Sequence, residues 1–501
     1  MGAVVLLAGV IRFWNFSSLG YEHWDEFYFL SSAASVSQQW PRGLGSINWA
    51  VAPLVPYTDG TLFHFFGANN WMPLAVSAIY GTLSALALYF LGSRLFGSAV
   101  GLIAAAVLAT AIFSVTFSRM GLADATFDFW VIAAALFIWL GFTRRRIRYW
   151  VIAGVCTGLT LNTKYTGVFP LLVAVSWVAV EFIVDLVARR HDSVLKAVSE
   201  YWPSAIGVAA LVVVALLMFS PWVWRLHDNP GFTAFFAHQQ AFTTQKTTPQ
   251  FIVWYYWLFT SPPTVLLAGA GIVVGLVRFT RADRFLLVYT AGWCAALMLF
   301  DAYPREALSL LPAVAIWAGR AIVEVWRLIR GWRPGTAFVA AAVAIACVAA
   351  VFIGQALTLP GVLSLRTQGY ADAGALANMY QSTGDTVLIG AQDSALLYVK
   401  HGVIFRPTRL VVQRLKDQPS SVVFMTDLTF GLNPTVQAFF ALNSDRLLAI
   451  ARVPNPLYPE VYLQPATTYK LSHLGDQPEA FKYITFWRAK APLLFPPGWP
   501  S

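Results

Sequence analysis

Long apolar runs with sharp polar ends recur along the first 358 residues of this chain and restrict its fold more than any other feature. A membrane-spanning helix needs about 20 apolar residues, and most of the runs reach or approach that length. We count eleven expected spans, to within one or two. They cover 1–16, 71–93, 97–117, 124–143, 149–162, 165–187, 203–224, 258–278, 285–300, 307–324 and 336–358. The first run has no basic residue ahead of it, unlike a cleavable signal peptide, which leaves room for a native start upstream.

The composition supports the same class. Hydrophobic residues make up 58% of the 501 residues and charged residues only 12%. A soluble protein could not bury so much apolar surface, because single cores stop growing near ~250–300 residues. We therefore expect a polytopic α-helical membrane protein and exclude disordered, collagen-like and nucleic-acid-binding classes. The three cysteines are far apart and form no Cys-x-x-Cys, so the sequence shows no disulfide framework or thiolate metal site.

Basic residues predict the orientation in a cell membrane. If the loop before residue 71 lies outside, the inside loops hold 14 basic residues and the outside loops six. Cytoplasmic loops carry the excess of Lys and Arg, so the loop 17–70 and the tail 360–501 are expected to be extracytoplasmic. The inside residues are Arg94, Arg144, Arg145, Arg146, Arg148, Arg189, Arg190, Lys196, Arg278, Arg281, Arg284, Arg327, Arg330 and Arg333.

Two regions lie outside the expected transmembrane domain of residues 1–358. The loop 17–70 contains amphipathic stretches at 26–40 and 61–67 that are too short to span, with tryptophans suited to the membrane interface. The tail 360–501 shifts to polar residues and turn formers. We expect a small α/β domain there, with strands at 386–389, 422–425 and 447–451 and helices at 370–381 and 434–442. Its last residues, rich in proline, predict an extended segment.

The strongest local signal is Glu22-His23-Trp24-Asp25-Glu26, directly after the first apolar run. Two adjacent carboxylates at a membrane surface suit acid–base or cation chemistry. The alternative is a solvated acidic start to the loop. Asp25 and Glu26 are therefore candidate catalytic residues.

A second pair of acids opens the run at 124–143. Asp124 and Asp128 are four residues apart and share one face of a helix. Asp128 would lie about one turn inside the bilayer, where acids usually face a cavity or a partner. The alternative is an acid favoured by the helix dipole, with Arg119 as its ion-pair partner, which explains Asp124 better than Asp128.

Lys164 is expected to lie below the outer membrane surface. Residues 149–161 rise only ~20 Å as a helix, against ~30 Å of hydrocarbon. A lysine at the end of so short a helix is enclosed by protein and needs an anion. The alternative is a lysine that snorkels to the lipid headgroups.

Arg305 lies in the outside turn Asp301-Ala302-Tyr303-Pro304-Arg305-Glu306. An arginine at a helix start near the outer surface suits phosphate, and a plain loop is the alternative. Four histidines also fall in outside segments. Their spacing matches no tight ligand motif, so a divalent metal stays an open alternative. They are His23, His64, His227 and His238.

The order of these motifs resembles polytopic GT-C glycosyltransferases of the protein O-mannosyltransferase and lipid A aminoarabinose transferase type. The resemblance covers roughly residues 1–325. One departure is the absence of the arginine that often opens the second span, where this chain has Asn69-Asn70-Trp71-Met72-Pro73. The matching segments are Ile11-Arg12-Phe13-Trp14, Asp25-Glu26, Pro53-Leu54 with Tyr57, Leu91 to Gly97, Ser118-Arg119 with Asp124, Thr163-Lys164-Tyr165-Thr166, and Arg305 with Leu311-Pro312.

The resemblance implies an inverting glycosyltransferase that moves a sugar from a polyprenyl-phosphate donor to a protein, lipid or glycan acceptor on the outer face. The family's catalytic base corresponds to Asp25, its second acid to Glu26, and its second-loop acid to Asp124, so the resemblance implies that these three residues are catalytic. Lys164, Arg119 and Arg305 are assigned to the donor phosphate. The chemistry agrees, because attack on an anomeric carbon needs a base and the leaving phosphate needs cations.

Two other functions are compatible with the residues. A transporter or flippase of lipid-linked sugar would use intramembrane acids and a lysine as an ion pathway. A non-catalytic scaffold subunit of a larger membrane complex would keep the fold alone. The long amphipathic loop and the attached outer domain favour the enzyme.

Overall fold

A computed structural model describes residues 1–21, 23–188, 193–227, 248–299, 304–332, 336–364, 366–390, 396, 398–405, 408–426, 434–454, 483–496 and 499. The chain forms two compact units. The first contains residues 1–14 and 32–363 and is helical. The second joins residues 15–31 to residues 364–501. Helix α2 (Trp24–Gln39) begins in the second unit and ends in the first. Several residues of the predicted motifs and loops lie outside the described residues: Glu22, Arg189, Arg190, His238, Asp301, Ala302, Tyr303 and Arg333.

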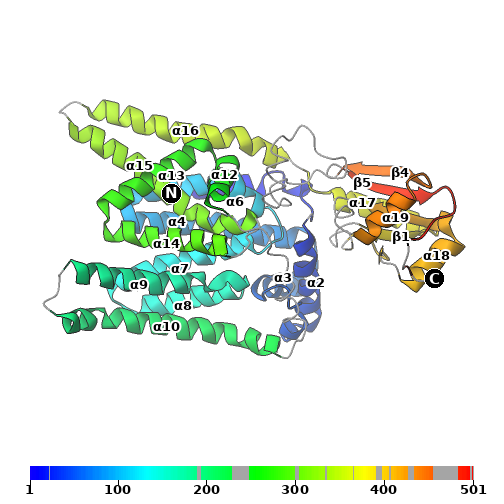
Figure 1. The fold of residues 1–501 in the computed structure, drawn as a ribbon, viewed down its shortest axis with the longest axis horizontal. Helices are drawn as coiled ribbons and strands as arrows, with labels where there is room; N and C mark the ends of the chain where they lie inside the picture. The colour runs from blue at the N-terminus through cyan, green and yellow to red at the C-terminus, as the bar shows by residue number, and fades with distance from the viewer. Residues whose placement is uncertain are drawn as a thin grey trace. The chain divides into compact units, whose positions relative to one another are not determined.

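The first unit is a bundle of apolar helices (Figure 1). Within the described residues, six apolar segments are long enough to cross a membrane: Trp71–Phe96, Asp124–Arg144, Tyr165–Val187, Val194–His227, Arg305–Gly331 and the segment that begins with α16 at Ala337. The bounds of its helices are α1 Gly2–Phe13, α3 Leu54–Phe66, α4 Trp71–Phe96, α5 Ser98–Thr110, α6 Ile112–Phe117, α7 Asp124–Arg144, α8 Ile147–Leu161, η3 Tyr165–Val168, α9 Phe169–Val187, α10 Val194–His227, α12 Pro249–Phe259, α13 Pro262–Arg278, α14 Arg281–Leu299, η4 Pro304–Leu310, α15 Leu311–Trp332 and α16 Ala337–Ser364.

Two expected spans are each divided into two helices. The run 97–117 breaks at Ala111, whose extended backbone separates α5 from α6. The run 258–278 breaks at Ser261, because Pro262 and Pro263 open α13 and cannot continue α12. Helix α10, in contrast, continues through Pro203 and Pro221 and is longer than the expected run 203–224.

Small residues let the helices of the bundle approach closely. Trp150 of α8 is 2% exposed and lies between α7 and α10. A Cβ atom added at Gly141 of α7 would lie 2.9 Å from the Trp150 indole, and one at Gly207 of α10 only 2.4 Å. Both glycines are therefore required by the ring, as at other close helix crossings in membranes.

A buried ion-pair network joins α9 to α14. Glu181 of α9 is fully buried, and its two carboxylate oxygens accept from Arg284 Nε at 2.6 Å and Arg284 Nη2 at 2.8 Å. Arg281 Nε donates to the same carboxylate at 3.0 Å. This bidentate geometry compensates the burial of the charge.

The second unit contains a five-stranded sheet of order β2-β1-β3-β5-β4. Strand β1 is parallel to β2 and β3, and β5 is antiparallel to β3 and β4. The elements are η1 Phe16–Ser18, α17 Gly369–Ser382, β1 Thr386–Gly390, β2 Val403–Ile404, α18 Arg409–Asp417, η6 Pro419–Ser421, β3 Val422–Thr426, α19 Pro434–Leu442, β4 Leu447–Pro454 and β5 Tyr483–Ala489.

Both faces of this sheet are covered. Val423 and Met425 of β3 pack with α17 in one core, and Val422 and Phe424 pack with α18 and α19 in the other. Every residue of β3 is buried, as expected of a central strand covered on both sides. The expected strands and helices of the tail match β1, β3, β4, α17 and α19, whereas β2, β5 and α18 were not expected.

Candidate active site

A short helix and a tight turn place Lys164 in the first unit. Helix α8 has 15 residues, so it rises only about 22 Å. The turn that follows is fixed by its own hydrogen bonds: the Lys164 N–H donates to the Thr160 carbonyl at 2.9 Å, and Thr160 Oγ1 donates to the Gly167 carbonyl at 2.7 Å. The side chain of Lys164 is 16% exposed.

Lys164 makes ion pairs with two carboxylates. Its Nζ lies 2.7 Å from Asp124 Oδ1 at the first residue of α7 and 3.0 Å from Glu306 Oε1 in η4. Burial disfavours the charged amine, but the two acids more than offset that effect, and the pKa of Lys164 lies above its ordinary value. Asp124 is almost fully enclosed, with a side chain 3% exposed, whereas that of Glu306 is 23% exposed.

Helix η4 brings further polar groups to Lys164. Arg305 Nε lies 3.8 Å from Glu306 Oε1. Ser309 Oγ donates to Asp128 Oδ1 at 2.9 Å, one turn into α7 from Asp124. Lys164, Asp124, Glu306 and Arg305 are named the Lys164 cluster below. It combines two cations and two carboxylates from three separate parts of the chain.

The loop 17–70 is attached to the turn that carries Lys164. The Leu54 N–H donates to the Asn162 carbonyl at 2.7 Å. The Tyr165 hydroxyl donates to the Trp49 carbonyl at 2.6 Å and accepts from Trp222 Nε1 at 3.2 Å. These bonds fix the 49–54 segment beside the Lys164 cluster.

Arg119 is placed differently from the other predicted phosphate ligands. It is 1% exposed, and its Nη1 donates to the carbonyls of Ile11, Arg12 and Trp14 at 3.3, 3.1 and 2.6 Å. These carbonyls end helix α1 and have no partners within it. The observed contacts of Arg119 are those of a helix cap, and its assignment to the donor phosphate stays a prediction.

The predicted acid pair lies in the second unit, at the first turn of α2. Glu26 is fully buried, and its Oε2 accepts from the backbone N–H of His23 at 2.8 Å, as in a capping box. The Asp25 N–H donates to His23 Nδ1 at 3.0 Å. Since Nδ1 is an acceptor there, its 3.9 Å approach to Asp25 Oδ2 is not an ion pair. The Asp25 side chain is 24% exposed.

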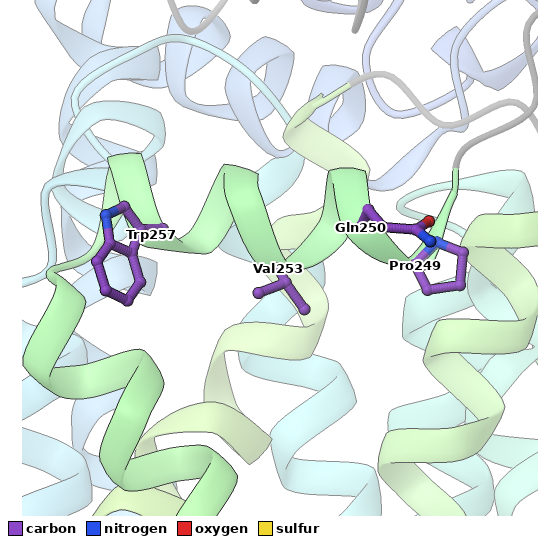
Figure 2. A pocket seen from close by; sticks show the side chains of 4 residues that line it. All are labelled: Pro249, Gln250, Val253 and Trp257. Atoms are coloured by element: carbon purple, nitrogen blue, oxygen red, sulfur yellow. The ribbon is translucent and has the colours of Figure 1, made fainter.

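An open apolar hollow of about 560 Å³ runs along α12 of the first unit (Figure 2). It is lined by Pro249, Gln250, Val253 and Trp257, and Val253 and Trp257 project on the same side of the helix. Tyr256, on a neighbouring face of α12, donates its hydroxyl to the Ala307 carbonyl of η4, and Ala307 follows Glu306 in the chain. Helix α12 therefore contacts the segment that carries Glu306.

Within the described residues, no group of three or more His, Cys, Asp or Glu side chains could hold a metal ion. His23 is occupied at the first turn of α2, and His64 Nδ1 lies 3.1 Å from the Ser37 carbonyl. Glu306 and Ser309 are polar residues of the site that the sequence did not single out as functional. In the sequence, only the position of Glu306 next to Arg305 indicates that either residue belongs to the site.

The chain is similar in sequence and fold to known proteins. The family profile described as dolichyl-phosphate-mannose-protein mannosyltransferase matches residues 50–224. An undecaprenyl phosphate-alpha-4-amino-4-deoxy-L-arabinose arabinosyl transferase from Erwinia tasmaniensis is 27% identical over 270 residues, which are 50% of this chain and 45% of that protein. The chain thus spans about half the length of the sequence relatives that it matches.

Solved structures show the same fold. ArnT from Cupriavidus metallidurans bound to undecaprenyl phosphate gives a TM-score of 0.57 at 16% identity, with 98% of each chain covered. The archaeal oligosaccharyltransferase AglB from Archaeoglobus fulgidus, in complex with an inhibitory peptide and a dolichol-phosphate, gives 0.61 at 14% identity, covering 88% of this chain and 70% of that one. These comparisons confirm the expected resemblance to GT-C glycosyltransferases and the multi-pass membrane class.

Proposed function

We propose that this protein is an inverting membrane glycosyltransferase that takes its sugar from a polyprenyl-phosphate donor. The Lys164 cluster is the observation that carries the proposal, because it holds a lysine and an arginine at the end of the short helix α8. We place the end of that helix below the outer membrane surface, because it is too short to cross the hydrocarbon. A lipid-linked donor has its phosphate near that depth. The sequence relatives are named arabinosyl transferases acting with undecaprenyl phosphate, and two solved neighbours bind polyprenyl phosphates.

The residues divide the reaction into two tasks. Asp25 takes the proton of the acceptor nucleophile, and Glu26, held at the helix start, fixes the turn that carries Asp25. Lys164 and Arg305 bind the donor phosphate and stabilise the charge that develops on it as the glycosidic bond breaks. Asp124 keeps Lys164 charged and oriented until the donor arrives.

The exposed carboxylate of Glu306 is the partner that the donor phosphate displaces. Its side chain is more exposed than that of Asp124 and it belongs to the shorter element, η4. Arg305 lies close enough to receive the carboxylate when it leaves Lys164. The apolar hollow along α12 suits the first isoprene units of the same donor.

We also propose the topology that the basic residues predict. The shorter apolar helices Gly2–Ser18, Ser98–Thr110, Ile147–Leu161 and Pro262–Arg278 would bring the six long ones to ten membrane segments. Helix α14, which matches the expected run 285–300, would be the eleventh. Asp25, Lys164 and the tail domain would all belong to the extracytoplasmic side. The acceptor would be a protein, a lipid or a glycan.

Lipid-linked sugar profiling tests the function. Cells without the protein should accumulate a polyprenyl-phosphate sugar on the outer face and lack one glycan, and wild-type protein should restore both. Asp25→Asn should restore neither, because loss of a general base slows a reaction by about 10²–10⁴-fold. Asp372→Asn is the matched control, since Asp372 pairs with Arg366 on the surface of the tail domain.

Two outcomes would contradict the proposal. If donor accumulated only on the inner face, the protein would be a flippase. If Asp25→Asn protein, present at the wild-type level, complemented fully, Asp25 would not be the base.

A further inference from the structure

The segment that carries the predicted base belongs to the tail domain. Residues 15–31 form one compact unit with residues 364–501, although more than 300 residues separate them in the sequence. The Thr367 N–H donates to the Ser18 carbonyl at 3.1 Å, and Gly20 N–H donates to Thr367 Oγ1 at 2.9 Å. A Cβ atom at Gly20 would lie 2.7 Å from the Thr367 carbonyl oxygen, so only glycine allows this approach.

Tyr398 provides the contact nearest to the acids. Its hydroxyl oxygen accepts from the backbone N–H of Tyr21 at 3.1 Å, and the two rings lie 6.3 Å apart. Its backbone is fixed by α17, because Asn378 Nδ2 donates to the Tyr398 carbonyl at 2.9 Å. Burial raises the pKa of Tyr398, so the hydroxyl keeps its proton at working pH. The position of the Tyr398 hydroxyl is therefore fixed by the packing of the tail domain.

Every second backbone N–H between Tyr21 and Asp25 donates a hydrogen bond to a side chain. The Tyr21 N–H is bound by Tyr398, the His23 N–H by Glu26 and the Asp25 N–H by the His23 ring. The Tyr398 bond holds the backbone two residues before His23, the residue whose N–H and ring make the local bonds of the first turn of α2.

We propose that Tyr398 is a positioning residue for the transfer reaction: it sets the direction of the Asp25 carboxylate through the Tyr21 backbone and makes the tail domain part of the catalytic machinery. This inference rests on the proposed function, in which Asp25 is the base. General-base catalysis depends strongly on the direction of the carboxylate, because the base must be within hydrogen-bond reach of the proton. A residue that fixes this direction changes kcat rather than donor binding.

Tyr398→Phe removes one oxygen atom and keeps the ring. Membranes that contain the full chain would be given donor and acceptor extracted from cells lacking the protein, and initial rates would be measured against donor concentration. We expect kcat to fall about 3–10-fold, the effect of one hydrogen bond, with KM for donor unchanged and the melting temperature within a few degrees of wild type. Tyr380→Phe is the matched control, because Tyr380 packs in the same domain against Phe486 and should keep the wild-type rate.

A double variant separates positioning from general destabilisation. If Tyr398 acts through Asp25, Tyr398→Phe should have no further effect on the residual rate of Asp25→Asn, whereas independent effects would multiply. An unchanged kcat for Tyr398→Phe, or multiplied effects in the double variant, would overturn the inference while leaving the proposed function intact. Full activity of Asp25→Asn alone would instead overturn the assignment of the base.

Discussion

Lys164→Met removes the cation of the Lys164 cluster and keeps most of the side-chain volume. Its main consequence falls on Asp124, whose side chain is 3% exposed and whose carboxylate lies 2.7 Å from the lysine. Removing one partner of a buried pair costs about 3–5 kcal/mol, because the remaining charge is uncompensated. Glu306 adds little, since it is more exposed and lies near Arg305. We therefore expect a loss of about 3 kcal/mol in the free energy of unfolding.

From the length of α8 and the residue type alone, Lys164→Met would be expected to fold as wild type does. The ion pair between Lys164 and Asp124 changes that expectation, because the variant leaves a buried carboxylate without its partner. Thermal unfolding of the purified protein in detergent would compare Lys164→Met, Asp124→Asn and the double variant. The double variant should recover most of the lost stability, because it leaves no buried unpaired charge. Lys400→Met, at an exposed lysine of the tail domain, is the control and should melt as wild type.

Binding of donor provides the second measurement. The double variant should be stable and should still bind polyprenyl-phosphate sugar more weakly than wild type, because the charge for the phosphate is gone. If Lys164→Met melted and bound donor as wild type does, Lys164 would be an anchor at the lipid headgroups. The donor phosphate would then have to be bound elsewhere.

The remaining predictions concern pH and topology. Burial raises the pKa of Asp59 in α3 to about 8, so between about pH 4 and pH 8 the folded protein holds a proton that the unfolded chain has released. The free energy of unfolding should fall across that range by at most about 1.4 kcal/mol per pH unit, and Asp59→Asn should remove this slope; a variant that keeps the wild-type slope would contradict the buried acid. Cysteines introduced at Ser46 and Ser382, with the native cysteines replaced, should both react with an impermeant reagent from outside the cell. Reaction from opposite sides would refute the proposed topology.

The enclosed position of Lys164 is predictable from the sequence, because it depends only on the length of the helix before it. The length of the run before it and the lysine itself predict a cation enclosed by protein, and the structure places it between carboxylates. Its partner Glu306 could not be chosen in advance, because the pair is 142 residues apart and depends on the packing of η4. Arg119 shows the same limit, since the unpaired carbonyls at the end of α1 that it binds leave no mark in the sequence around it.

The tail domain was predictable where apolar runs are continuous. Strand β3 is buried on both faces, and its residues Val422–Thr426 therefore read as a plain apolar run. Strand β5 alternates instead, with Ile484 and Phe486 in the core and Thr485 between them, and the sequence analysis does not predict it. Helix α18 was hidden by its charges, although Val411 and Leu415 at helical spacing form its buried face.

The order of synthesis gives the Glu181 ion pairs a further consequence. Glu181 lies in α9, and the first arginine that pairs with it comes 100 residues later in the chain. At ribosomal speeds of about 5–20 residues per second, α9 exists for about 5–20 s before that arginine is made. During this interval an acid that the finished bundle encloses has no arginine partner from α14. The ion pairs therefore form late, and α9 reaches its final packing against α14 only after these arginines have been made.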